Sequence, residues 1–270
     1  MIERTLALLT KSLRKRRRRT VKKAGRKLIS GLAGFAARQS LVGDQPIYDS
    51  TAFPFLKTIE ECAPVITNEL QGVLEDRHSL PPFHEISPDQ KYISTGTDWK
   101  VFFLYGFGIP IKRNCALCQQ TAALLEIVPG LQSAWFSILA PRYHIPRHRG
   151  VSKTVLRAHL GLVVPKDAQN CLMEVGDARV SWTAGKSFVF DDFYPHEVWN
   201  NTEDERIVLI FDFERPMRLP GRLVNKALMW GIKRTAYYKD AARNLKDWDN
   251  RLEAAATRAD VMFDDVLPLD

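Results

Sequence analysis

Two histidines and an arginine lie within or at the start of predicted strands in the second half of the chain, and their side chains suit metal-dependent chemistry. Four of the six histidines lie within residues 144–196, and we take His159 and His196 as the candidate metal ligands. Two imidazoles with open coordination positions suit iron(II) that activates dioxygen. Arg206 follows ten residues after His196, and its planar guanidinium can bind a carboxylate through two parallel hydrogen bonds.

The strand predicted around His159 carries a polar face that needs an explanation. Alternate side chains of a strand point to opposite faces, so Arg157, His159 and Gly161 share one face and the apolar residues between them share the other. Charged and polar groups inside a barrel need a partner or a ligand. A carboxylate usually completes such an iron site, but Gly161 stands two residues after His159. Water would then have to fill the third position.

Longer motifs around these residues resemble those of the aspartyl/asparaginyl β-hydroxylase family. Residues 157–165, Arg-Ala-His-Leu-Gly-Leu-Val-Val-Pro, are similar to its first metal-site motif, and residues 189–199 are similar to its second. The similarity runs from about Trp99 to Met217, with a further short match at residues 81–87. The family lacks the iron-binding carboxylate and includes bacterial lipid A 2-hydroxylases and related lipid acyl hydroxylases. The glycine at position 161 therefore agrees with the resemblance.

The resemblance implies an iron(II)- and 2-oxoglutarate-dependent dioxygenase that hydroxylates an unactivated carbon. It places Arg206 against the 2-oxoglutarate carboxylate and implies that Arg157 and His148 line the co-substrate or substrate pocket. Three functions remain open. The favoured one is 2-hydroxylation of a membrane-lipid acyl chain, the second is β-hydroxylation of Asp or Asn in peptides or proteins, and the third is a non-catalytic jelly-roll binding module.

The elements that must position these residues are mainly short strands. Runs rich in β-branched and aromatic residues recur over residues 134–213, and turn signals such as Ala184-Gly185 separate them without intervening helical patterns. This texture is typical of a sandwich or barrel rather than an α/β fold. We predict a mainly β protein with a double-stranded β-helix core, of the jelly-roll or cupin-like kind, over about residues 99–217.

The core is expected within a dioxygenase domain of residues 41–218, with helices beside it. Apolar periodicity predicts helices over Leu56 to Leu74 and Cys115 to Ile127. Residues 219–270 are predicted to form a C-terminal helical extension that packs on the barrel or forms a second membrane-facing surface.

The charge of the chain is concentrated at one end. The 270 residues include 45% hydrophobic and 26% charged residues with a net charge of +8, proportions that are ordinary for a soluble globular protein. Residues 1–38 contain 13 of the 39 Lys and Arg residues and a single acidic residue, so the remaining chain is mildly acidic. We predict that residues 1–40 form a basic arm, flexible or membrane-interfacial.

An anionic membrane surface is the favoured partner of this arm. Four apolar residues at helical spacing lie beside its cations, and the two together favour binding to anionic lipid; they are Ile2, Leu6, Leu9 and Leu13. A solvated tail is the alternative, and nucleic acid is not expected. A signal peptide is disfavoured because the basic region is too long and dense. No apolar run has the length of a membrane-spanning helix, so we expect a cytoplasmic protein that is peripheral on the inner face of the membrane.

Overall fold

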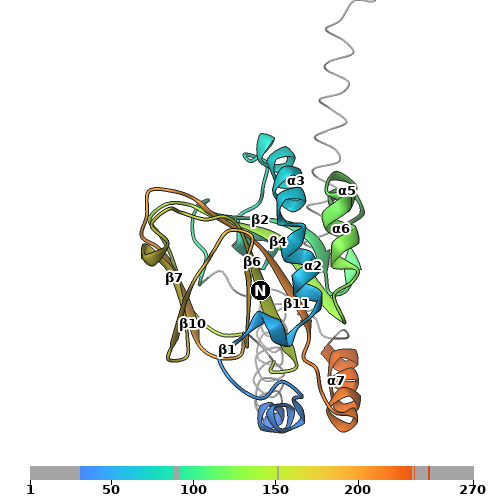
Figure 1. Ribbon diagram of the computed structural model, residues 1–270. Coiled ribbons are helices and arrows are strands. Elements are labelled where there is room, and N and C mark those ends of the chain that lie inside the picture. Colours follow the sequence, from blue (N-terminus) through green and yellow to red (C-terminus); the bar gives the residue numbers. More distant parts are fainter. Residues whose placement is uncertain (1–30, 88–91, 151, 233, 235–242, 244–270) are drawn as a thin grey trace, which may run out of the picture.

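Two antiparallel β-sheets face each other in the computed structural model, which describes residues 31–87, 92–150, 152–232, 234 and 243 (Figure 1). The larger sheet has seven strands in the order β1 (Ile47–Tyr48), β9 (Ser187–Phe190), β6 (Val155–Val163), β11 (Arg206–Glu214), β4 (Leu131–Leu139), β2 (Trp99–Gly106) and β3 (Ile109–Pro110). The smaller sheet has four strands in the order β5 (Tyr143–His148), β10 (His196–Asn200), β7 (Cys171–Val175) and β8 (Ala178–Ser181). This double-sheet architecture confirms the predicted jelly-roll core.

Helices flank the larger sheet, and Figure 1 shows α2, α3, α5 and α6 together along one side of it. The described helices are α2 (Phe55–Glu61), α3 (Ala63–Glu75), α4 (Phe83–Ile86), α5 (Lys112–Leu117), α6 (Gln119–Leu125) and α7 (Leu219–Ile232), with short 3-10 turns at Ser50–Ala52 and Ala168–Asn170. Residues 31–39 are also helical. The rest of the basic arm, and the predicted extension beyond α7 apart from residues 234 and 243, lie outside the described residues.

The alternation of side chains along the central strands divides the core into two layers. On β11, Leu209 and Phe211 pack with the helices on the outer face, whereas Val208 and Ile210 pack between the two sheets. On β6 the four apolar residues Leu156, Ala158, Leu160 and Leu162 belong to the outer layer. Because these four side chains face outward, Arg157 and His159, which alternate with them, face inward, as the period of two predicts.

The predicted helix over residues 56–74 is wrong in one respect, because the structure divides it at Cys62 into α2 and α3. The interruption follows from Pro64, which lies in the first turn of α3. Proline has no N–H to donate and its ring clashes with the carbonyl four residues earlier, so an α-helix cannot continue through it without a break.

The predicted helix over residues 115–127 is likewise divided, here at Cys118 into α5 and α6. The carboxylate of Glu69 on α3 accepts hydrogen bonds from the backbone N–H groups of Gln120 and Thr121, each at 2.8 Å. A side chain from another helix therefore caps the first turn of α6 and allows a new helix to begin there.

The strand β5 was not predicted, because Pro141 and Pro146 interrupt its pattern. Proline is tolerated on an edge strand, where its missing N–H breaks no ladder hydrogen bond, and β5 lies at the edge of the smaller sheet. Its register places His148 opposite His196 on β10. In the described part of the chain, no helix is long and apolar enough to cross a membrane.

Candidate active site

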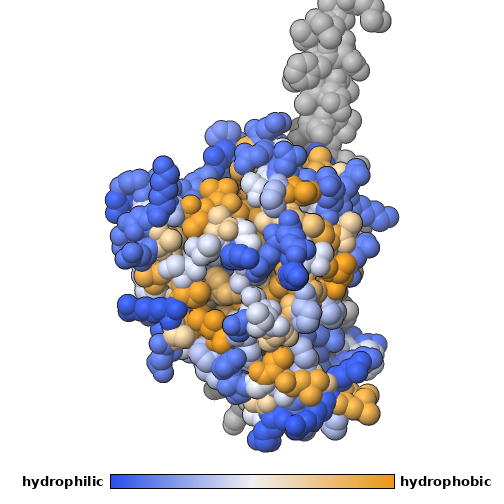
Figure 2. Space-filling model, in the orientation of Figure 1, coloured by the Kyte–Doolittle hydropathy of each residue, from blue (hydrophilic) through white to orange (hydrophobic). Residues whose placement is uncertain are grey.

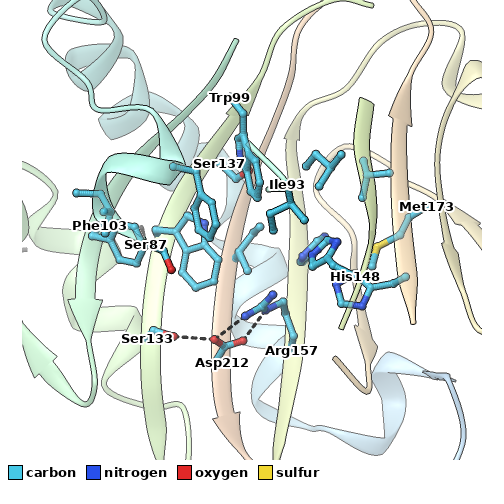
Figure 3. A pocket seen from close by; sticks show the side chains of 18 of the residues that line it. Ser87, Ile93, Trp99, Phe103, Ser133, Ser137, His148, Arg157, Met173 and Asp212 are labelled. Carbon is cyan, nitrogen blue, oxygen red and sulfur yellow. Dashed lines mark hydrogen bonds and ion pairs between the residues drawn. The ribbon is translucent and has the colours of Figure 1, made fainter. Parts of the chain in front are cut away.

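A cavity of about 160 Å³ lies between the two sheets. All five residues that the sequence indicated for a site line it, although they come from four strands: His148, Arg157, His159, His196 and Arg206. Figure 3 shows Arg157 and Asp212 in the lower part of the view, with Trp99 above them, Phe103 to the left and His148 to the right. The fold therefore brings these polar residues and large apolar side chains to the lining of one pocket.

His148 and His196 form a pair across the smaller sheet, with ring centroids 4.1 Å apart. Nδ1 of His148 donates to the carbonyl of Pro146 at 2.8 Å, and Nδ1 of His196 donates to the carbonyl of Tyr194 at 2.9 Å. A carbonyl can only accept, so both protons are on Nδ1 and each neutral ring keeps a lone pair on Nε2. That tautomer is the one a metal ligand needs.

The two imidazoles of this pair are neutral at physiological pH. Burial, with a smaller effect from the adjacent His196, lowers the pKa of His148 to about 4. Burial also lowers the pKa of His196 to about 4, although its hydrogen bond to Tyr194 acts in the opposite direction. Neutral rings with free Nε2 lone pairs fit a divalent transition metal.

His159 has the opposite tautomer. The indole N–H of Trp182 donates to Nδ1 of His159 at 3.2 Å. Because indole only donates, Nδ1 of His159 accepts and the neutral ring carries its proton on Nε2. Burial, with smaller effects from Arg206 and Arg157, holds the pKa of His159 well below its usual value. A protonated Nε2 is a hydrogen-bond donor rather than a metal ligand, whereas Nε2 of His148 and Nε2 of His196 each keep a free lone pair. The ligand pair of His159 and His196 stays a prediction.

Arg206 is a buried cation that could bind an anion. Its side chain is at the start of β11, and the residue is only 1% exposed. Its Nε and Nη1 atoms have no hydrogen-bond partner among the described residues. Burial lowers the pKa of Arg206 to about 10, which still leaves it charged at neutral pH. A buried charge without a counter-ion is costly, and an anion that enters the pocket would relieve this cost.

Arg157, by contrast, already has carboxylate partners. Its Nε and Nη2 donate to the two carboxylate oxygens of Asp212 at 2.6 and 2.9 Å, and its Nη1 donates to Asp192 at 2.7 Å (Figure 3 shows the Asp212 pair). Asp192 also lies 3.4 Å from Nε2 of His196. Arg157 therefore connects the acidic residues around the histidine pair, and its charge is balanced within the protein.

Backbone packing explains the glycine at position 161. A Cβ atom there would lie 2.5 Å from the carbonyl oxygen of Thr183, and the N–H of Gly185 donates to the carbonyl of Gly161 at 2.8 Å. No side chain fits, so this position cannot supply a carboxylate ligand. Consistently, no group of three or more His, Cys, Asp or Glu side chains is arranged to hold a metal ion within the described ranges.

A buried ion cluster fixes the turn that leads into His196. The carboxylate of Asp191, which is fully buried, accepts from Lys153 at 2.8 Å and from Arg215 at 2.5 Å. Its other oxygen accepts from the backbone N–H of Phe193 at 3.0 Å. Arg215 in turn donates to the hydroxyl of Tyr48 at 2.7 Å. The turn between β9 and β10 is thereby anchored to the larger sheet.

Several residues of the site were missed by sequence reasoning. Trp182 lies in an irregular segment after β8, and only its contacts with His159 and Arg206 reveal a role. The remaining apolar and polar lining comes from distant segments, and no spacing in the sequence could have joined these residues to the histidines. They are Phe83, Ile86, Ile93, Trp99, Phe103, Trp135, Ser137 and Asp212.

The fold and the pocket define a double-stranded β-helix protein with a histidine-rich, arginine-containing site. The sequence model of the family described as Aspartyl/Asparaginyl beta-hydroxylase matches residues 60–216. This is more than half of the chain, and the chain therefore belongs to that family of hydroxylases.

Known relatives agree with this membership. The chain is 43% identical over 215 residues to the ornithine lipid ester-linked acyl 2-hydroxylase of Rhizobium tropici, covering 80% of this chain and 76% of that protein. It is 29% identical to the human aspartyl/asparaginyl beta-hydroxylase over 61% of this chain, which spans 22% of the human protein. A Pseudomonas putida prolyl-4-hydroxylase structure aligns over 57% of this chain and 87% of that one, with 19% identity and a TM-score of 0.36.

Proposed function

We propose that this hydroxylase is an iron(II)- and 2-oxoglutarate-dependent dioxygenase. The observation that carries the proposal is that two features line one pocket. One is a buried cation without an anion at Arg206, and the other is a pair of neutral imidazoles with free lone pairs at His148 and His196. A dicarboxylate co-substrate bound beside a divalent metal would satisfy both.

In this proposal His148 and His196 hold the metal, and Arg206 binds the distal carboxylate of 2-oxoglutarate. The planar guanidinium suits two parallel hydrogen bonds to that carboxylate. His159, with its proton on Nε2, would donate a hydrogen bond to a carboxylate oxygen. The bound iron would supply the oxidation, in which dioxygen converts 2-oxoglutarate to succinate and carbon dioxide and gives one oxygen atom to a C–H bond of the substrate.

The protein residues orient the reactants and exclude water. The inter-sheet layer around the histidines is closely packed by apolar side chains such as Ile145, Val198 and Phe190. A dry site strengthens the attraction between Arg206 and a carboxylate, and it protects reactive species from solvent.

For the substrate, we propose a membrane-lipid acyl chain hydroxylated at carbon 2. Large apolar side chains form much of the pocket lining, and they match a hydrocarbon chain better than a carboxylate or amide side chain; they are Phe83, Ile86, Ile93, Trp99 and Phe103. The extended similarity to a relative named as a lipid acyl 2-hydroxylase supports the same substrate class.

Mass spectrometry of lipids and peptides from cells that express the wild-type protein or Arg206→Ala tests the proposal. We expect lipids with one additional oxygen, located at carbon 2 of an acyl chain by fragmentation, only with the wild-type protein. Oxygen gained on Asp or Asn side chains, with unchanged lipids, would instead establish peptide β-hydroxylation. Binding of 2-oxoglutarate without turnover on either substrate would establish a binding module.

A further inference from the structure

The helix α7 presents apolar side chains to solvent. Leu219, Leu223 and Trp230 recur at helical spacing, and they are 65%, 59% and 61% exposed. An amphipathic helix of a globular protein normally turns such a stripe toward the core. Large apolar side chains gathered on one exposed face indicate a surface for a partner.

The other side of α7 is already packed against the protein. Gly221 lies so close to the helical segment 31–39 that a Cβ atom there would be 2.6 Å from Cβ of Gln39. Arg218 donates its backbone N–H to the carbonyl of Gln39 at 2.9 Å, and Asn225 is buried. The exposed stripe is therefore separate from the face of α7 that packs against the rest of the protein.

The exposed charged residues described on α7 beside the stripe are cations. Arg222 and Lys226 are exposed on α7, and Arg218 is exposed just before its first residue. Arg234 lies over the Trp230 ring with its guanidinium carbon 3.4 Å from the ring centroid. The sequence has no acidic residue between Glu214 and Asp240. Figure 2 shows hydrophobic and hydrophilic atoms side by side at the lower edge of the molecule, where Figure 1 places α7.

We propose that α7 docks the protein on an anionic lipid bilayer. Leu219, Leu223 and Trp230 would enter the boundary between headgroups and acyl chains, while Arg222 and Lys226 contact lipid phosphates. Interfacial helices combine an apolar face with basic residues because burial and charge attraction then act together. This proposal goes beyond the proposed reaction and holds whatever the substrate is.

Two other occupants fit the surface less well. A nucleic acid could bind the cations through its phosphates, but it would not bury the two exposed leucines. A second copy in a two-fold dimer would place the same patch against itself, which would bring the unneutralised cations of both copies together.

Vesicle sedimentation of the full-length protein tests the proposal. The probes are phosphatidylcholine vesicles with and without phosphatidylglycerol, across a salt series. We expect the wild-type protein to bind anionic vesicles and to retain some binding at salt that screens the arm. Leu223→Gln/Trp230→Gln should lose that salt-resistant binding. Arg222→Gln/Lys226→Gln should weaken binding at low salt by roughly 25-fold, about fivefold for each cation.

Matched variants away from α7 control for composition and folding. Leu117→Gln removes an exposed leucine on α5, and Lys57→Gln/Lys112→Gln removes two exposed cations. These variants should bind as the wild type does, and all variants should have wild-type circular dichroism. In hydrogen exchange, anionic vesicles should slow the amides of α7 in the wild-type protein.

Three results would overturn the proposal. The first is unchanged vesicle binding by both α7 variants. The second is binding of the α7 face to a duplex oligonucleotide but not to anionic vesicles. The third is slow exchange of α7 that depends on protein concentration and not on vesicles, which would identify a second copy as the partner.

Discussion

Trp182 contacts both His159 and Arg206. Its indole N–H donates to Nδ1 of His159 at 3.2 Å, and its ring lies 4.6 Å from the guanidinium carbon of Arg206. The hydrogen bond fixes the proton of His159 on Nε2, and the stacking orients a cation that lacks a counter-ion. A residue outside the predicted motifs thus positions both groups that we assign to the co-substrate.

Trp182→Phe should weaken 2-oxoglutarate binding without preventing metal binding. Phenylalanine keeps an aromatic ring beside Arg206 but removes the hydrogen bond to His159, which is worth about 1 kcal/mol, or roughly a fivefold rise in the apparent KM for 2-oxoglutarate. Steady-state kinetics with 2-oxoglutarate as the varied substrate measures this rise. Trp199→Phe is the matched control, because Trp199 stacks on His144 away from the cavity. An equal rise in the apparent KM for Trp182→Phe and Trp199→Phe would contradict the role assigned to Trp182.

Three histidine variants separate the two assignments of the metal ligands. His148→Ala and His196→Ala should each reduce affinity for Fe(II) by more than the roughly 10- to 100-fold that loss of a supporting residue costs. His159→Ala should retain the metal and raise the requirement for 2-oxoglutarate. Anaerobic calorimetric titration with Fe(II) measures the affinities, with the exposed His144→Ala as the control. Metal loss in His159→Ala but not in His148→Ala would restore the ligand pair first predicted from the sequence.

Arg206→Ala should abolish productive 2-oxoglutarate binding at ordinary concentrations. Loss of one partner of a desolvated charge pair costs about 2–5 kcal/mol, which is roughly 30-fold to several thousandfold in affinity. Binding of 2-oxoglutarate to the metal-loaded protein can be followed by calorimetry. The exposed Arg179→Ala removes a charge of the same type from the smaller sheet and should change nothing. An unchanged affinity in Arg206→Ala would mean that a different residue holds the carboxylate.

Gly161→Ala should destabilise the protein rather than merely alter its chemistry. The new Cβ would meet the carbonyl oxygen of Thr183 at 2.5 Å, and overpacking of this kind typically costs about 1–3 kcal/mol. Gly161→Asp should be at least as harmful, because its carboxylate cannot reach the metal site without a backbone shift. Gly72→Ala on α3 is the matched control, since its Cβ meets no atom within 4 Å. A lower midpoint of thermal unfolding for Gly72→Ala than for Gly161→Ala would contradict this account.

The sequence was sufficient for the parts of the fold that local patterns determine. The period of two on β6 predicted correctly that Arg157 and His159 face the inside of the jelly roll, because a single strand carries that information. The same reasoning located Arg206 at the start of β11. The charge clustering at the N-terminus could be read from the sequence, but the predicted arm and its partner lie largely outside the described residues and stay predictions.

The rest depended on contacts between distant segments. His148 lies on a proline-containing edge strand whose pattern does not indicate β-structure, and its position opposite His196 comes from the pairing of β5 with β10. The tautomer of His159 depends on Trp182, which is brought near by the fold. The partners of Arg157 are likewise set by the packing of β11 against β6. Spacing along the chain contains no record of these contacts, so the sequence could not show that His148 and His196 lie side by side.

The coupled turnover of 2-oxoglutarate tests the central claim most directly. The purified full-length protein, loaded with Fe(II) and supplied with dioxygen and extracted bacterial lipids, should form one succinate for each oxygen atom added to an acyl chain. His196→Ala and Arg206→Ala should form neither product under the same conditions. Lipid hydroxylation that proceeds without 2-oxoglutarate, or at wild-type rates in either variant, would contradict the account.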